Sequence, residues 1–526
     1  MSILNDAIAV ISPKWARNRA VAAMQYQSIK GYEAAKPSRT HKANKEGRSA
    51  NTAVFAAGKS LREQARWLDE NHDISIGILD RLEERVIGAQ GFIVEPQPRD
   101  KDGNILDKFA EELQRRFAAW SLKPDVTGKF TRPEFERLAL RTALRDGEVF
   151  GQHVVGKIPK LDHLNPQGTP YSIEALEPDF IPFYDQPGNG IIQGFSVDSW
   201  RRVKGYNVLL QHPQEVVGFK HKTKFIPAKA MMHLANIKRL HQYRGISIFH
   251  GILTRLADIK DYEESERVAA RIAAALAFYI KRGSPQDYTP PTCEQTAREI
   301  PIAPGMTFDD LAPGEDVGMI ESNRPNVHMV EFRNGQLKAC GAGTRTSYSS
   351  ISRDYSGTYS SQRQELVEQD ESNRILQQWF CAGWSRPVYR QWLEAEQLNQ
   401  IDPLRLPPEL DVRTLFDAVY YGPTMPWIDP AKEADGWEAM IAGNAATEAE
   451  WARARGRNPS EVKRQRQREV DYNRDHGMIT ANDPDPSTNG VSNETNNASG
   501  SLLRERADKR RNDRTARRTD TNQQAG

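Results

Sequence analysis

Residues 53–60 hold the first arrangement that could do chemistry, a relaxed phosphate-binding loop in which Ala53 replaces the first glycine and Gly58, Lys59 and Ser60 close the pattern. A working loop of this kind needs a buried strand before it, so that backbone N–H groups and the next helix start converge on the phosphates. The preceding residues 42–52 are polar and show no strand pattern. The sequence therefore favours a helix start with Lys59 in solvent, and it leaves a nucleotide hydrolase as the alternative.

Two other groups could hold a metal ion. Residues 177–179, Glu-Pro-Asp, could form the carboxylate pair of a metal-dependent nuclease, but no acid-x-Lys strand follows at a suitable distance. His233, His241 and His250 lie near one another in the chain, with spacings that are poor for a metal site and with no adjacent cysteine or acidic pair. We expect a turn at 177–179 and structural histidines, and we expect no metal and no cofactor.

The three cysteines, Cys293, Cys340 and Cys381, are widely spaced and odd in number, which argues against a disulfide framework or a zinc cluster. The N-terminus carries Asp6 inside a short amphipathic run and has no basic start, so we expect no signal peptide. No stretch approaches the ~18 uninterrupted apolar residues of a membrane span. These features favour reduced, buried thiols in a soluble protein of the cytoplasm, without a membrane partner.

Bulk composition excludes few classes of protein. A chain of 526 residues with 38% hydrophobic content is long enough for two or more lobes with sizeable cores. The formal net charge is only +2, which argues against tight electrostatic capture of nucleic acid as the main task. A nucleic acid that slides past is still compatible with this balance.

The N-terminal half reads as a mixed α+β lobe. Residues 30–60 lack apolar periodicity and read as a surface arm, whereas residues 61–88 follow a helical pattern that ends at Gly88 before an extended run at 92–94. Further amphipathic helices are expected at 109–120 and 133–144. Short strands are expected at 149–155, 173–176, 194–197, 206–210, 216–219 and 231–234.

The second half is dominated by long helices. Residues 247–282 form the cleanest helical pattern, residues 284–325 are rich in proline, and another helix is expected from Val330. A helix from about 361 to 398 should be bent or divided at Pro387. Its aromatic stripe could stack on bases but at this spacing is more simply core; the members are Trp379, Phe380, Trp384 and Trp392.

Residues 435–475 read as charged helices, and after Asp483 the composition predicts disorder. This tail carries a basic cluster that is diluted by acids, so a solvated tail and a weak contact with nucleic acid or capsid both stay open. The cluster comprises Arg504, Arg506, Lys509, Arg510, Arg511, Arg514, Arg517 and Arg518.

A dense Ser/Thr/Tyr/Gly run with interspersed arginines lies between the helical patterns at 339–366. It is too polar for a core strand and resembles the segment around the tunnel loop of tailed-phage portal proteins of the lambda type. The matching residues are Ser352, Asp354, Tyr355, Ser356, Tyr359, Ser360, Ser361 and Arg363.

The resemblance extends in order over roughly residues 50–400. It includes the helix from Asn71 to Gly88, the turn from Arg145 to Phe150, and the strand from Leu176 to Ile181. It continues through Val203 to Pro213 and through Met232 to Gly245, where His233, Gln242, Arg244 and Gly245 match.

This resemblance implies an α+β portal fold assembled as a ring, with an α+β wing, a long-helix stem, a small clip insertion and a helical crown. The implied parts are an N-terminal arm (1–50), the wing (51–245), a stem helix (246–283), the clip (284–325), a second stem helix (326–345), the tunnel loop (346–360), a long helix returning to the wing (361–430), the crown (431–482) and a disordered basic tail (483–526).

The implied function is a homododecameric channel at one capsid vertex of a virion, assembled in the host cytoplasm and without an active site of its own. Double-stranded DNA would pass in during packaging by the terminase large subunit and out during ejection. Major capsid and scaffolding proteins and head-tail adaptors are the other implied partners. A tail or baseplate scaffold that conducts no DNA remains a second alternative.

Contacts with DNA in such a channel should be weak and repeated, because strong phosphate contacts would hold the DNA in place. Pairing of the arginines with acids of a neighbouring subunit, such as Glu365 or Glu368, is an equal alternative. The candidate residues are Arg345, Ser349, Ser352, Arg353, Asp354, Tyr355, Ser356, Tyr359, Ser360 and Arg363.

Overall fold

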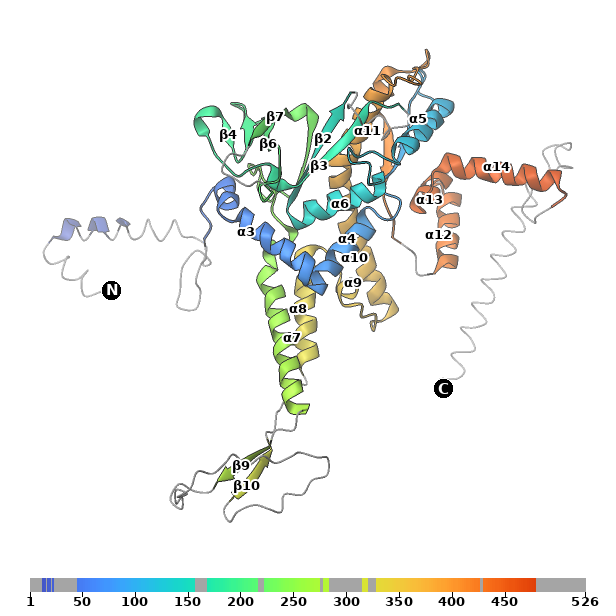
Figure 1. Cartoon of the computed structure of the whole chain (residues 1–526). Coiled ribbons are helices and arrows are strands. Elements are labelled where there is room, and N and C mark those ends of the chain that lie inside the picture. The colour runs from blue at the N-terminus through green and yellow to red at the C-terminus, as the bar shows by residue number, and fades with distance from the viewer. Residues whose placement is uncertain are drawn as a thin grey trace, which may run out of the picture. The chain divides into compact units, whose positions relative to one another are not determined.

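The computed structural model describes residues 12–15, 17–19, 21–22, 45–156, 168–215, 222–274, 278–282, 315–319, 328–425 and 429–478. It divides the chain into two compact units, Met1–Pro430 and Ala431–Gly526 (Figure 1). Several expectations concern segments that lie wholly or mostly outside the described residues: the arm up to residue 44, the strand at 216–219, most of 284–325, Cys293 and the tail after residue 483.

Within residues 45–156 the first unit has four helices: α3 (Ala50–Asn71), α4 (Asp73–Val86), α5 (Asp107–Trp120) and α6 (Arg132–Arg145). The Ser49 hydroxyl caps α3 by accepting the Thr52 N–H at 3.1 Å, which explains why a helix begins inside the polar stretch. The expectation of a surface arm through residue 60 was therefore wrong from residue 50 onward. The pattern at 61–88 belongs to two helices, because the extended backbone of His72 separates α3 from α4.

Two antiparallel sheets follow, and they confirm the α+β class. The three-stranded sheet has the order β3-β2-β8, made of β2 (Glu148–Val155), β3 (Tyr171–Leu176) and β8 (Met231–Ala235). The four-stranded sheet has the order β4-β5-β6-β7, made of β4 (Ile191–Ile192), β5 (Phe195–Val197), β6 (Val203–Leu209) and β7 (Thr223–Pro227).

Strand β7 was missed because it is an edge strand whose side chains are mostly exposed and whose sequence, Thr-Lys-Phe-Ile-Pro, lacks an apolar alternation. Strand β1 (Ile93–Pro96) is the expected extended run. It pairs with β11 (Ala418–Tyr421), which lies near the C-terminal end of the first unit in sequence. Short 3-10 turns fill the connections at Pro178–Phe180, Pro187–Asn189, Ala228–Ala230 and Val412–Thr414.

Two long helices run side by side away from this lobe, α7 (Leu253–Ala274) and α8 (Met329–Thr344), with a 3-10 turn at Ile248–Gly251 leading into α7 (Figure 1). Arg333 donates from Nε to Glu263 Oε1 at 2.5 Å, and the rings of Tyr262 and Phe332 lie 5.1 Å apart. At 1.5 Å per residue, α7 is about 33 Å long.

The helix expected through Arg282 ends earlier. Residues 278–282, Phe-Tyr-Ile-Lys-Arg, form strand β9, which pairs antiparallel with β10 (Glu315–Met319) inside the proline-rich segment. Aromatic and β-branched residues favour strands, and the pairing with a partner distant in sequence overrides the helix propensity of the preceding alanines.

A short helix α9 (Tyr348–Ser352) precedes α10 (Tyr359–Phe380), a π-helical turn (Cys381–Ser385) and α11 (Arg386–Glu396). The division just before Pro387 was predicted. Phe380, Trp384 and Trp392 are fully buried in the main core, and Phe380 stacks on Phe92 with ring centres 5.8 Å apart. Trp379, the fourth member of the aromatic stripe, is half-buried and packs against this core, so the stripe belongs to the core rather than to a base-stacking surface. Cys340 and Cys381 are buried free thiols.

The second unit contains α12 (Pro430–Ala442, of which Pro430 belongs to the first unit), α13 (Glu448–Ala454) and α14 (Pro459–Asp475). Thr447 and Glu450 form a reciprocal capping box at the start of α13. Trp437 of α12 stacks on Trp451 of α13 with ring centres 6.2 Å apart. In the part of the chain that the structure describes, no helix is long and apolar enough to cross a membrane.

Candidate functional site

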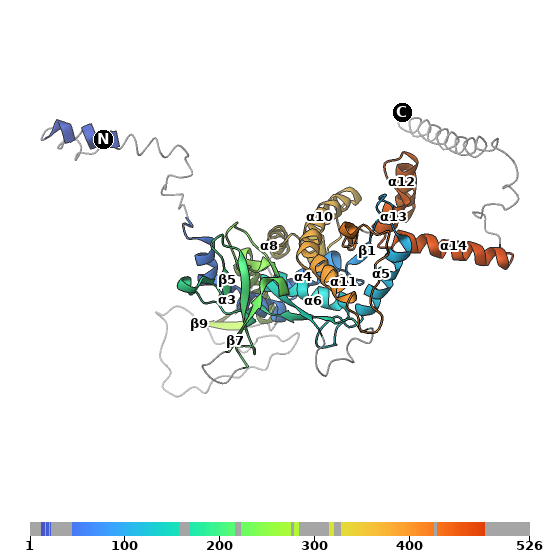
Figure 2. The same ribbon diagram turned by 90° about the horizontal axis from the view of Figure 1, so that it is seen from above.

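The segment Arg345–Arg363, which we call the Ser/Tyr segment, joins α8 to α10 through α9. Arg345 is the C-cap of α8 and Arg353 is the C-cap of α9, and both arginines adopt the left-handed conformation, with φ of 61° and 58°. This conformation costs a residue other than glycine roughly 1 kcal/mol. Two of the predicted DNA-contacting arginines are therefore the residues at which the backbone reverses. Figure 2 shows α8 and α10 from above.

Hydrogen bonds at its base tie the Ser/Tyr segment to α10. The Ser349 N–H donates to Glu365 Oε1 at 2.9 Å, and Gln369 Nε2 donates to the Arg345 carbonyl at 2.9 Å. The Ser352 hydroxyl donates back to the Tyr348 carbonyl at 2.8 Å. Ser349 and Ser352 are thus half-buried supports, and Glu365 accepts a backbone amide.

The tip of the segment, residues 353–360, is exposed throughout. Asp354 organises it by accepting the Ser356 N–H at 3.0 Å and the Tyr348 hydroxyl at 3.2 Å. The hydroxyl and N–H of Ser356 lower the pKa of Asp354. The Thr358 hydroxyl then accepts the Ser361 N–H and starts α10. The tip has a defined shape although it has no core of its own.

The structure places the predicted residues in three groups. Arg345 caps α8, and Ser349 and Ser352 lie on α9. Arg353, Asp354, Tyr355 and Ser356 form the exposed tip, and Tyr359, Ser360 and Arg363 lie on the first turns of α10. The tip offers a guanidinium, phenols and hydroxyls, which can donate to phosphate oxygens.

The phosphate-loop pattern does not form a phosphate-binding loop. Residues 53–60 lie inside α3, where the helix uses the backbone N–H groups. Gly58 is buried, and a Cβ there would meet Val54 at 3.3 Å and Phe183 at 3.4 Å. Lys59 is exposed and 3.9 Å from Glu63. The prediction of a helix with Lys59 in solvent is confirmed, and this segment gives no support for a nucleotide hydrolase.

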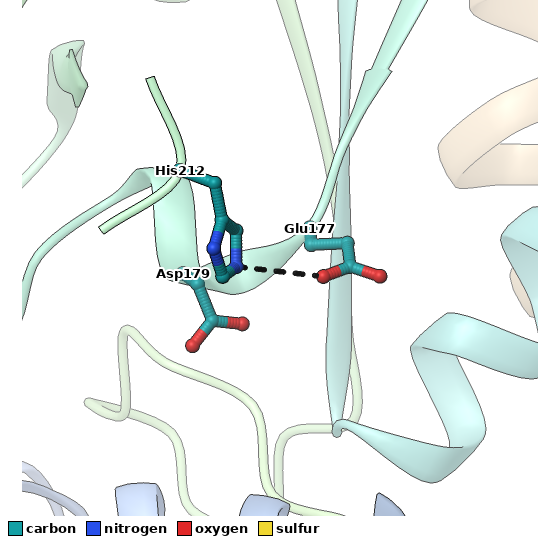
Figure 3. A group of neighbouring side chains, drawn as sticks. All are labelled: Glu177, Asp179 and His212. Carbon is teal, nitrogen blue, oxygen red and sulfur yellow. Dashed lines mark ion pairs between the residues drawn. The ribbon is translucent and has the colours of Figure 1, made fainter. Parts of the chain in front are cut away.

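A histidine that the sequence analysis did not connect with residues 177–179 lies beside their two carboxylates. The ligand atoms of Glu177, Asp179 and His212 lie within 4.8 Å of one another, and His212 is 3.9 Å from Glu177 (Figure 3). Two arginines already neutralise this group: Arg66 lies 2.5 Å from Asp179, and Arg62 lies 3.4 Å from it. We assign no metal to this group, since a cation would have to compete with both guanidinium groups.

The three predicted histidines do not converge on one site. His233 Nε2 lies 3.0 Å from Glu148 Oε2, whereas His250 Nδ1 lies 2.9 Å from the Ser247 carbonyl and His241 is exposed. The hydrogen bonds of His233 and His250 agree with their interpretation as structural residues, whereas the exposed position of His241 gives that interpretation no support.

Sequence reasoning missed a buried assembly of charged residues, which we call the charge cluster. Its centre is Glu148, which accepts from Arg244 Nε at 2.6 Å, from the Gly245 N–H at 3.0 Å and from Arg62 at 3.4 Å. Arg66 extends it by bonding Asp146 at 2.7 Å. The members are Arg62, Arg66, Asp146, Glu148, Asp179, His233 and Arg244.

All three guanidinium nitrogens of Arg244 donate hydrogen bonds. Besides Glu148, it donates to the carbonyl oxygens of Pro178, Ile181 and Gln193 at 3.0–3.2 Å, and its guanidinium carbon lies 4.0 Å from the centre of the Phe183 ring. A buried charge is tolerable only when it is paired and hydrogen-bonded in this way. Arg244 thus holds two loops and strand β2 together.

Burial by itself would raise the pKa of Glu148, but the positive charge of Arg244, the hydrogen bond from His233 and the charge of Arg62 outweigh it and lower the pKa to about 2. Burial lowers the pKa of Arg244 although Glu148 opposes the shift. Glu148 is therefore ionised at neutral pH, and its role is structural pairing.

Two glycines allow the chain segments of this cluster to touch. A Cβ on Gly245 would lie 1.9 Å from the Gly147 carbonyl oxygen, and a Cβ on Gly147, whose φ is +95°, would lie 2.4 Å from the Ile246 backbone. The motif residues 145–150, 176–181 and 242–245 therefore meet at one place. Motif spacing alone could not show this convergence.

The sequence of this chain is similar to sequences of known proteins. The profile of the family described as phage portal protein, lambda family, matches residues 36–377. A curated relative, a "Probable portal protein" of Halomonas phage phiHAP-1, is 22% identical over 438 residues and covers 78% of this chain and 80% of its own length.

Two solved structures are similar at 12% identity. One is the neck of a native gene transfer agent particle computed with C12 symmetry, with a TM-score of 0.39 over 77% of this chain and 97% of the other. The second is the virion of a native gene transfer agent particle, with a TM-score of 0.42 over 78% of this chain and 99% of the other. Because the family profile covers well over half of its length, the chain belongs to the lambda family of phage portal proteins.

Proposed function

We propose that this portal protein forms a closed homododecameric ring at one capsid vertex and conducts double-stranded DNA, with the tip of the Ser/Tyr segment contacting the DNA in transit. The observation that carries the contact is the exposure of every residue from 353 to 360, on a base that is hydrogen-bonded to α10. An exposed tip with a defined shape is suited to contacting a partner that moves past it.

Ring assembly is supported by apolar surface that one subunit leaves uncovered. The α7–α8 pair exposes Val268 on α7 and Val330 and Phe332 on α8. A rod about 33 Å long with such side chains gains stability if neighbouring copies cover it. A ring allows every subunit to make the same contact on both sides.

The tip fits weak and repeated DNA contacts. Arg353 is its cation, and the side chain of Tyr355 is 60% exposed. An exposed charge contributes about 0–1 kcal/mol per contact, so one subunit would hold DNA loosely while several subunits together guide it.

The other partners follow from family membership. We propose that the terminase large subunit and the head-tail adaptors dock on the segment 284–325, that major capsid and scaffolding proteins surround the ring, and that assembly takes place in the host cytoplasm. The terminase would supply the energy for packaging, and this chain would act as a passive conduit.

The test is a double variant, Arg353→Ala with Tyr355→Ala, incorporated into particles. Neither side chain is buried, so rings should form normally while nuclease-protected DNA per particle falls. Arg353→Gly and Arg353→Ala both remove the guanidinium, but only glycine also removes the strain of the left-handed conformation. Comparing the two variants therefore separates the effect of the charge from the effect of the backbone. Leu122→Ala, an exposed position on the turn after α5, is the control. Normal DNA content in the double variant would remove the tip from the mechanism.

A further inference from the structure

The second unit carries a cleft that family membership leaves unexplained, since the family profile ends at residue 377. It lies between α13 and α14 and encloses about 600 Å³, within the range of small-ligand sites. Its lining residues are Glu448, Trp451, Ala452, Arg455, Arg457, Pro459, Val462, Lys463 and Arg466.

Positive charge dominates this α13–α14 cleft. Four of its side chains are cationic, and Glu448 is its only acid. Arg455 lies 3.4 Å from Glu433, and Lys463 lies 3.5 Å from Glu448. Arg457 and Arg466 have no ion-pair partner among the described residues, so two guanidinium groups are available to an anion.

The cations are held in place by ordered elements. Arg457 follows a tight reversal at Gly456, whose φ is +69°, and the Asn458 side chain caps α14 by accepting two backbone N–H groups. Lys463 and Arg466 are three residues apart and so lie on one face of α14. Trp451, stacked on Trp437, gives the cleft a rigid wall.

We infer that the α13–α14 cleft binds the phosphodiester backbone of double-stranded DNA. Guanidinium groups bind phosphate oxygens in pairs, and several cations around a groove create the sequence-independent attraction typical of DNA-backbone contacts. This inference rests on the proposed function, in which DNA is the polyanion that every ring handles. The experiments below distinguish duplex DNA from two other occupants of the cleft, an acidic protein segment and a second copy of this chain.

The experiment uses assembled full-length protein and a duplex of about two helical turns. Duplex binding is followed by fluorescence anisotropy over a range of salt concentrations. The variant is Arg457→Ser with Arg466→Ser. The matched control is Arg468→Ser, an exposed cation on the same helix that does not line the cleft. Ring mass and thermal unfolding are measured first for each variant.

Each phosphate contact contributes about 0.9 to the slope of log affinity against log salt, so the double variant should lose about 1.8 of that slope and the control should lose none. An unchanged slope, or an equal loss in Arg468→Ser, overturns the inference.

The rate at which Lys463 is acetylated, compared with that of Lys432, tests the same cleft in the protein without substitutions. This test decides the question even if the double variant fails to assemble. Duplex DNA should protect Lys463 selectively. Protection of Lys463 in rings without DNA would mean that a second copy fills the cleft, and protection by an acidic peptide but not by the duplex would identify a protein partner; either result overturns the inference. Rings that package DNA normally, but whose duplex affinity and Lys463 protection do not depend on the cleft, would contradict this inference without contradicting the proposed function.

Discussion

Arg244 Nε donates to Glu148 Oε1 across 2.6 Å, and neither side chain has any exposed surface. The two residues lie in different motifs, 96 positions apart. Because each charge is buried, the loss of one partner leaves the other uncompensated in the protein interior. The pair therefore fixes the start of β2 to the loop that leads toward α7.

Glu148→Gln should lower the free energy of unfolding by roughly 3–5 kcal/mol, since the substitution keeps the shape but leaves the buried Arg244 charge unpaired. Glu177→Gln is the matched control: Glu177 also faces an arginine, at 3.5 Å, but its side chain is 48% exposed, so the change should stay within about 1 kcal/mol. Urea unfolding of both variants checks this. Equal effects would mean that burial of the pair is unimportant.

Acid should remove the contribution of Glu148. Its pKa falls from an ordinary 4.5 to about 2 on folding, so between these values the unfolded chain binds more protons than the folded chain. The stabilisation is fully present above about pH 4.5 and is lost as the pH falls toward 2. The difference in unfolding free energy between the natural chain and Glu148→Gln should therefore shrink over this window. A difference that stays constant with pH would contradict the assignment.

Gly245→Ala should prevent folding of the first unit, because its Cβ would lie 1.9 Å from the Gly147 carbonyl oxygen, a backbone atom that cannot move aside. Gly77→Ala is the control: it lies in α4 with no atom within 4 Å of the new Cβ, so it should stabilise the chain by about 0.5–1 kcal/mol. The yield of soluble protein and the melting temperature distinguish the two. Soluble, native-like Gly245→Ala protein would show that the two backbones can separate.

Val330→Asp should impair ring formation without unfolding the subunit. Val330 is 65% exposed on α8, and Val412, 63% exposed in the turn before β11, provides a control of the same residue type and exposure. Both substitutions should change subunit stability by less than about 0.5 kcal/mol. Sedimentation should then show rings for Val412→Asp and smaller species for Val330→Asp. Intact rings in both would place the subunit contact elsewhere.

Local patterns in the sequence predicted most helices and strands of the first unit, since apolar periodicity reports which face of an element is buried. The errors came where partners distant in sequence decide the outcome. Tyr279 fits a helical spacing with the residues before it, yet it pairs with Gly318 in a strand. Residues 50–60 lack apolar periodicity, yet a single hydroxyl from Ser49 starts a helix there.

The candidate site was predictable to a different degree. The tip residues 353–360 could be proposed as a candidate site from the polar run and its resemblance to the portal family, because they are contiguous in the sequence. The charge cluster could not, because Arg62, Glu148 and Arg244 meet only after three separate segments fold together. The available signal was the presence of charged residues within apolar patterns, such as Arg62 in α3 and Glu148 at the start of β2.

The π-helical turn at Cys381–Ser385 has a consequence for how the length of this protein can change. A π turn contains one residue more than an α turn, so the helices on either side keep the orientation they would have in a continuous α-helix with that residue removed. Deleting one residue here should leave Phe380 and Trp392 facing the core, whereas a deletion elsewhere in α10 or α11 would rotate one of them by about 100°. The turn is therefore a place where insertions and deletions of one residue can accumulate among homologues without repacking the core.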